Sequence, residues 1–148
     1  MNSDPLMVRV SRAYRAPPER VFDAWLDPAI AERFLFATAD RRRVRVEIDA
    51  RVGGRFRIDE QRGDELATHS GEYREIDRPR RLVFTFAAEP AEPPTLVTID
   101  IVPTDDGCEL TLTHEMDAKW AEWADRTREG WAQMLGGLDA ALAAARGG

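Results

Sequence analysis

The chain has 148 residues, which is enough for one hydrophobic core and short for two domains. Its net charge of −6 argues against nucleic-acid binding and against docking on anionic lipid, because both require basic surfaces. No apolar run approaches the roughly 20 residues of a membrane span, so no membrane insertion is expected. Residues 1–7 lack the pattern of a signal peptide, and the single cysteine excludes a disulfide framework. A single domain over residues 1–148 in the cytoplasm is the simplest interpretation.

The first part of the chain predicts a strand followed by two short helices. Residues 8–14 alternate between apolar and polar side chains, which is typical of a strand. Two prolines and Glu19 then open a helix that buries Trp25 among other apolar residues. Asp27 and Pro28 supply an N-cap and a first helical residue for a second helix.

From residue 43 onward the hydrophobic period changes to two. Strands are expected at residues 44–48, 55–59, 67–76, 82–86, 97–101 and 110–114. The turns between them are short, which favours antiparallel neighbours. Each strand has one apolar and one polar side, so only one face of the sheet is expected to be covered.

The last segment, residues 123–145, has apolar and small side chains at steps of three and four. It predicts an amphipathic helix of about six turns, and its internal glycines suggest close packing or a bend. The expected fold class is therefore α+β: a seven-stranded curved antiparallel sheet wraps around a long C-terminal helix. The two short helices lie between the first and second strands.

Motifs that carry a family resemblance extend over nearly the whole chain. They are residues 16–25, 27–28, 52–56, 71–76, 81–86 and 110–114, followed by Gly130, Trp131, Leu135, Leu138 and Leu142. In this order they resemble the START-like helix-grip superfamily (SRPBCC) of polyketide cyclases and lipid-transfer domains. Within it, the chain looks like the Aha-type family, homologous to the C-terminal domain of the activator of the ninety-kilodalton heat-shock chaperone ATPase.

The resemblance implies a cavity between the long helix and the sheet, and an apolar cavity with a few polar groups is a typical ligand site. Strand alternation and helical spacing direct ten side chains toward it: Trp25, Phe56, His69, Tyr73, Phe84, Phe86, His114, Trp123, Thr127 and Trp131. The simpler alternative is that the aromatic side chains fill the core, where they contribute strongly to packing.

Three functions are compatible with this pattern. The first is a binding module for a small hydrophobic or amphipathic molecule. The second is an enzyme of cyclase or hydrolase type that uses His69, His114 or Tyr73, because histidine titrates near neutral pH. Either histidine can instead be a buried neutral side chain bonded to the backbone, to Tyr73 or to Thr127. The third is a chaperone-interacting module in the stress response, as the resemblance implies. No catalytic residue can be assigned from the sequence.

Neither a metal nor a cofactor is expected. Cys108 and His114 share a strand face, but six residues of strand span roughly 20 Å, too far for one ion. The chain is expected to be a monomer or a homodimer, because an edge strand of an open sheet can pair with a second subunit.

Overall fold

The computed structural model describes residues 6–34, 44–62, 64–89, 95–116, 121–122 and 124–147. Its elements, in chain order, are β1 (Leu6–Tyr14), α1 (Pro18–Ala24), α2 (Pro28–Phe34), β2 (Val44–Ile48), β3 (Arg55–Arg62), β4 (Glu65–Asp77), β5 (Arg81–Glu89), β6 (Thr95–Thr104), β7 (Gly107–Met116) and α3 (Ala124–Gly147). None of the helices within these ranges is long and apolar enough to cross a membrane.

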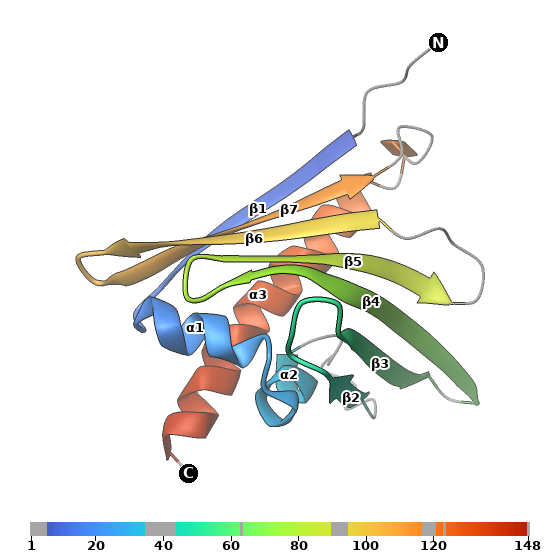
Figure 1. Ribbon diagram of the computed structural model, residues 1–148, viewed down its shortest axis with the longest axis horizontal. Helices are drawn as coiled ribbons and strands as arrows, with labels where there is room; N and C mark the ends of the chain where they lie inside the picture. The colour runs from blue at the N-terminus through green and yellow to red at the C-terminus, as the bar shows by residue number, and fades with distance from the viewer. Residues whose placement is uncertain are drawn as a thin grey trace.

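The predicted helix-grip fold is confirmed. The seven strands form one antiparallel sheet in the order β1-β7-β6-β5-β4-β3-β2, and this sheet curves around α3 (Figure 1). The first strand lies beside the last one, with Val8 opposite His114. Helices α1 and α2 make the connection from β1, at one edge, to β2 at the other edge.

The strands run further than the hydrophobic alternation predicted. β4 begins at Glu65 and β6 continues to Thr104, because backbone pairing extends past the apolar positions into the turns. The described part of the long helix begins at Ala124. Residues 117–120 and 123 lie outside the described part of the chain.

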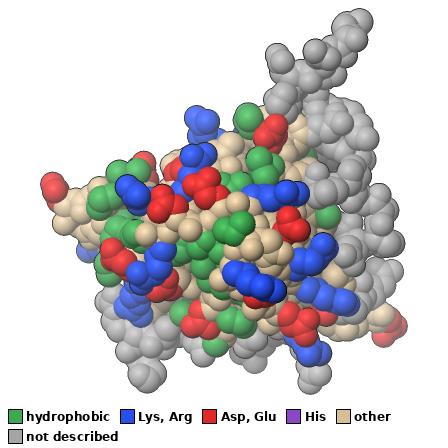
Figure 2. Space-filling view, in the orientation of Figure 1, with side chains coloured by type: hydrophobic (Ala, Val, Ile, Leu, Met, Phe, Trp, Pro, Cys, Tyr) green, Lys and Arg blue, Asp and Glu red, His purple; other side chains and the backbone are tan. Residues whose placement is uncertain are grey.

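The outer face of the sheet is polar, as expected for a sheet covered on one side. Figure 2 shows basic and acidic side chains interleaved over this face. Among them Arg57 pairs with Asp59 at 2.9 Å, and Arg81 approaches Asp100 to 3.5 Å. Such exposed pairs contribute little to the free energy of unfolding, but they keep this face hydrated.

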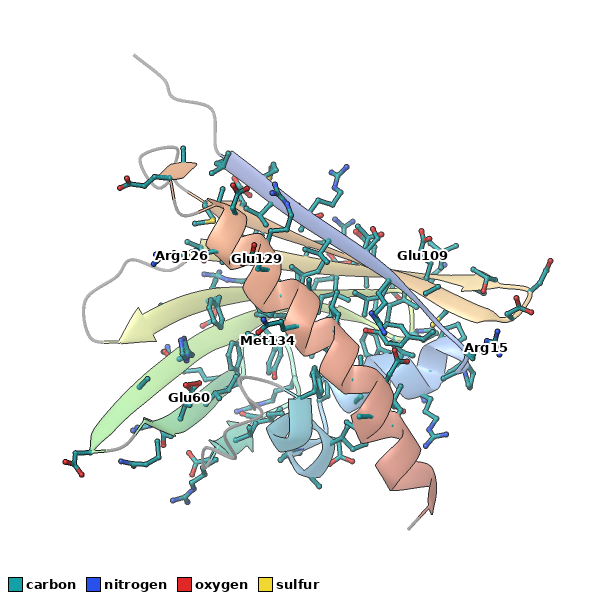
Figure 3. All side chains as sticks on the ribbon, turned by 180° about the vertical axis from the view of Figure 1, so that it is seen from behind. Arg15, Glu60, Glu109, Arg126, Glu129 and Met134 are labelled. Carbon is teal, nitrogen blue, oxygen red and sulfur yellow. The ribbon has the colours of Figure 1, made fainter. Side chains whose placement is uncertain are left out.

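The apolar stripe of α3 covers the concave face (Figure 3). Trp131, Leu135, Leu138 and Leu142 are buried at steps of three and four, as the sequence predicted. The hydroxyl of Tyr14 donates a hydrogen bond of 2.7 Å to the carbonyl of Leu135, and burial raises the pKa of this tyrosine. This hydrogen bond from β1 to the middle of α3 fixes the position of the helix along the sheet.

The two short helices begin where the sequence predicts, at Pro18 and Pro28. Asp27 caps α2, since its Oδ1 accepts a hydrogen bond of 3.0 Å from the amide of Ala29. Trp25 is the C-cap of α1, so its ring sits at the bend between the two helices. Phe34, at the end of α2, packs edge-on against that ring at a centroid distance of 5.1 Å.

The glycines of α3 do not interrupt the helix. A Cβ at Gly137 would lie 3.6 Å from the Cβ of Phe34, so close packing against α2 occurs there. At Gly130 no atom lies within 4 Å of the same position. The predicted packing role therefore applies to Gly137 and not to Gly130.

Gly71 allows β3 and β5 to approach β4 closely. A Cβ at this position would lie 1.8 Å from the carbonyl oxygen of Thr85 and 2.6 Å from Cε1 of Phe56. Two residues further along, the ladder between β4 and β5 shifts register between Tyr73 and Glu75. A shift of this kind bends a strand, so the curvature of the sheet is concentrated beside Phe56 and Tyr73.

We expect Gly71→Ala to lower the free energy of unfolding by about 1–3 kcal/mol, because the methyl group overlaps the backbone of β5 and the ring of Phe56. The matched control is Gly130→Ala, where the added methyl group meets open space in a helix and is expected to stabilise by roughly 0.4–1 kcal/mol. Urea unfolding of both variants measures the difference. Equal effects of the two substitutions would contradict the close approach at Gly71.

Candidate functional site

A pocket lies between Trp131 of α3, the bend after α1 and the concave side of strands β2 to β5. The described residues that line it are Trp25, Val46, Ile48, Phe56, Ile58, Tyr73, Leu82, Phe84, Phe86 and Trp131. It holds about 390 Å³ of space between atoms, counting the part open to solvent. Only a small part of this space is wide enough for a water-sized group.

Aromatic rings contact one another around the pocket and hold its walls in place. Phe56 meets Phe84 edge-on at a centroid distance of 5.3 Å and Tyr73 at 5.6 Å. Phe86 lies 5.5 Å from Trp131, and Trp131 lies 6.5 Å from Trp25. Tilted and edge-to-face contacts of this kind stabilise aromatic clusters beyond the area they bury.

The structure brings together six of the ten side chains that the sequence directed toward the cavity: Trp25, Phe56, Tyr73, Phe84, Phe86 and Trp131. His69, His114 and Thr127 are not among the described lining residues, and Trp123 lies outside the described part of the chain. Val46, Ile48 and Leu82 also line the pocket. The alternation of apolar and polar residues in β2 and β5 was the sequence signal that could have added these three residues to the candidates.

His114 belongs to a hydrogen-bonded chain behind the pocket wall. The indole Nε1–H of Trp131 donates to its Nδ1 at 3.1 Å. Its Nε2 lies 2.6 Å from the hydroxyl oxygen of Thr95, which in turn donates to the carbonyl of Phe86 at 2.9 Å. Because an indole nitrogen can only donate, Nδ1 of His114 must be unprotonated, and Nε2 carries the proton that goes to Thr95.

These hydrogen bonds, together with burial, determine the protonation state of His114. The residue is 6% exposed, and burial lowers its pKa from 6.5 to about 4. A second proton on Nδ1 would also break the bond from Trp131. His114 is therefore neutral at physiological pH and serves to fix the ring of Trp131. This is the alternative of a buried neutral histidine, although its partners are Trp131 and Thr95 and not those expected.

His69 and Glu60 make the outer end of the concave face more polar. His69 stacks on Phe86 with ring centroids 5.4 Å apart and an interplanar angle of 11°. Glu60 lies on the same side of β3 as Phe56 and Ile58 and is 1% exposed (Figure 3). The alternation of β3 extends to Glu60, so the sequence could have placed this side chain on the inner face. It was not included among the sequence candidates, because it is an acidic residue at the end of a strand.

Besides Trp131, two lining residues, Trp25 and Tyr73, carry a polar side-chain atom. The Nε1 of Trp25 is buried and has no hydrogen-bond acceptor among the described residues. Burial, and secondarily the charge of Asp49, raises the pKa of Tyr73, so its phenol stays protonated at physiological pH. None of the described lining residues carries a formal charge.

No group of three or more histidine, cysteine, aspartate or glutamate side chains converges as a metal site in the described ranges. Cys108 is buried, and burial raises the pKa of its thiol. A buried protonated thiol behaves as a small apolar side chain, and here it packs in the core beside Leu110.

A long helix held by a curved antiparallel sheet, with an apolar pocket between them, defines a START-like helix-grip domain. The chain belongs to the family of Activator of Hsp90 ATPase homolog 1-like proteins, whose family model matches residues 15–143. No match is found among proteins of curated function.

Solved structures share this fold over nearly their whole length. Protein CV1439 from Chromobacterium violaceum is 29% identical, with a TM-score of 0.82 over 92% of this chain and 96% of that one. The AHSA1-like protein from Aeromonas hydrophila is 22% identical, with a TM-score of 0.77 over 95% and 94%. Protein SA2116 from Staphylococcus aureus, of unknown function, is 16% identical, with a TM-score of 0.85 over 98% of both chains.

The low pKa of His114 predicts a specific dependence of stability on pH. Between pH 6.5 and about 4 the unfolded chain binds a proton at His114 that the folded chain does not, so stability is complete above 6.5 and is lost as pH falls through this window. The loss amounts to roughly 3 kcal/mol for a shift of this size.

The matched variant is His114→Gln, which keeps an acceptor and a donor but does not titrate. Urea unfolding across the same window should show a shallower decline in the variant than in the wild type. Parallel curves would contradict a neutral, buried His114.

Proposed function

We propose that this protein binds a small hydrophobic or amphipathic molecule in the pocket between α3 and the sheet. The observation that carries the proposal is a pocket between α3, the bend after α1 and strands β2 to β5, whose described lining residues are apolar or aromatic and carry no formal charge. A concave, mostly apolar site of this kind is the usual form of a small-molecule site.

The shape of the wall supports binding. Six of its ten described residues are aromatic, and their mutual ring contacts keep them in place without a ligand. A preformed site reduces the ordering cost that binding would otherwise incur. Val46, Ile48 and Ile58, the smaller aliphatic residues, leave the space that larger side chains would occupy.

Catalysis by the candidate residues has weaker physical support. His114 donates and accepts hydrogen bonds with its two ring nitrogens, and its pKa of about 4 makes it a poor base at neutral pH. The raised pKa of Tyr73 keeps its hydroxyl from acting as a phenolate. His69 stacks on Phe86 and does not belong to the described pocket wall.

A chaperone-related role remains the alternative. It is supported by the family description, which refers to activation of the Hsp90 ATPase. For this chain, the pocket is an internal feature that a ligand can occupy, whereas a chaperone would need an outer surface. The described outer face carries interleaved charges of both signs (Figure 2), which does not single out one docking region.

The test is native mass spectrometry of gently purified protein, followed by solvent extraction of the bound molecule. We expect a stoichiometric small-molecule adduct on the wild type. Val46→Phe should remove it, because the larger ring fills the pocket from β2. The matched control is Val102→Phe, the same substitution at a position that is 59% exposed on β6, which should retain the adduct.

Circular dichroism should show that both variants remain folded. An adduct that persists in Val46→Phe would place the ligand elsewhere. A wild-type protein without adduct, and without a thermal shift across a panel of lipids and aromatic compounds, would count against the proposal.

A further inference from the structure

The open sheet has two edge strands, β1 and β2, each with one neighbouring strand in the described part of the chain. β1 pairs with β7 and β2 pairs with β3, and they lie at opposite ends of the sheet (Figure 1). The free side of an edge strand carries backbone amides and carbonyls to which another chain can bind. The two edges differ in the charges of their side chains, and this difference decides which edge suits a second copy of the chain.

The charges of β1 oppose pairing of this edge with itself. Its charged side chains, Arg9 and Arg12, are both basic. Arg12 already binds Asp139 of α3, with an N–O distance of 2.6 Å. Two copies of β1 side by side would bring basic residues together without an acidic residue between them, which is unfavourable. Basic residues on an edge strand are a common protection against such pairing.

β2 carries one basic and one acidic side chain on the outer face of the sheet. Arg45 and Glu47 alternate with the pocket residue Val46, and their side chains are 77% and 60% exposed. Toward β3, Arg45 lies opposite Asp59, and Glu47 lies opposite Arg57. Opposite charges therefore already face each other across this pair of strands. Arg45 and Glu47 also approach each other to 3.2 Å, but an exposed pair of this kind is weak and is readily exchanged for another.

Backbone hydrogen bonds show which groups of β2 face its free edge. The amide of Asp49 donates to the carbonyl of Arg55 at 3.0 Å, which continues the β2–β3 register past Ile48. Successive residues of a strand direct their amides and carbonyls to alternate sides. Those of Glu47 therefore face β3, whereas those of Val46 and Ile48 face the free edge.

The free edge of β2 is self-complementary about its middle residue, Val46. In an antiparallel pair centred there, Val46 of the two copies exchange both of their amide–carbonyl hydrogen bonds. Arg45 then lies opposite Glu47 of the second copy, in a non-hydrogen-bonded pair, where side chains come closest. Each row of charges across the joined sheets runs Asp59, Arg45, Glu47, Arg57, and it alternates in sign throughout.

We propose that this protein forms a two-fold symmetric homodimer in which β2 of one copy pairs antiparallel with β2 of the other, centred on Val46. The two sheets then form one continuous sheet. β2 has five residues, so the interface is short and the dimer is weak, with a dissociation constant of about 10–100 µM. Because Val46 and Ile48 also line the pocket, the second copy lies beside the β2 side of each pocket.

The test is sedimentation velocity over a protein concentration range of roughly 1 µM to 1 mM. Arg45→Glu leaves β2 with acidic side chains only, and Glu47→Arg leaves it with basic side chains only. Symmetry places like charges in both cross-strand pairs of each variant. We therefore expect each variant alone to have a dissociation constant raised by roughly 10-fold or more.

A mixture of these two variants tests the pairing itself. The acidic strand of Arg45→Glu faces the basic strand of Glu47→Arg in the mixture, so the two should associate at least as tightly as the wild type. A fluorescent label on one variant makes the mixed dimer visible. Arg45→Glu also places two acids opposite each other at Asp59 within one chain, and recovery of association in the mixture separates the lost interface from any loss of folding.

Arg9→Glu is the matched control, because it makes the same charge reversal on the other edge strand. It should leave the dissociation constant unchanged. Circular dichroism should show that all variants are folded.

Amide hydrogen exchange of the ¹⁵N-labelled wild type locates the interface without a substitution. Exchange at the amides of Val46 and Ile48 should slow as the protein concentration rises, because these groups become hydrogen-bonded in the dimer. The amide of Glu47, which faces β3, and the amides of β1 are the internal controls.

A wild-type protein that is monomeric over the whole range would overturn the proposal. A dimer that Arg45→Glu does not weaken, or that Arg9→Glu abolishes, would also overturn it. Larger species that grow with concentration would indicate pairing of β1 with β2 between copies and would contradict the two-fold dimer. Exchange at Val46 that does not depend on concentration would exclude β2 as the interface.

Discussion

One long helix, with the short helices α1 and α2 beside it, has to cover the concave face of seven strands, and most of the structure follows from this constraint. A flat sheet of that width would leave apolar positions in contact with water on either side of α3. The sheet therefore curves, and its curvature is concentrated where Gly71 lets three strands approach and the register shifts after Tyr73. The helix is fixed lengthwise by the bond from Tyr14 to the carbonyl of Leu135.

The pocket is a consequence of the same arrangement. The helix stripe and the sheet meet closely where Leu135, Leu138 and Leu142 pack in the core. Toward β2 and β3 the sheet curves away from α3, and the rings of Trp25, Phe56 and Trp131 bridge the remaining distance. The pocket therefore lies where the sheet curves, and most of its described lining residues are aromatic.

The polar side chains around the pocket are held in uncharged forms. His114, placed to contact Trp131, is held neutral by burial and by the bonds on both ring nitrogens. The bond to His114 also orients the indole of Trp131 as part of the wall. The buried donor of Trp25 differs from these groups, because the Trp131 indole and both ring nitrogens of His114 have defined partners.

The sequence by itself determined the order and type of the elements, because periods of two and of 3.6 reflect which side of each element is apolar. It also identified six of the pocket residues, since strand alternation and helical spacing indicate the inward side. Tertiary structure alone decided which inward residues meet. Parity places His114 inward, but only the packing of β7 against α3 and β6 gives it Trp131 and Thr95 as partners. Likewise, no local pattern could show that the indole of Trp25 would be buried without an acceptor among the described residues, because this depends on elements far apart in the chain.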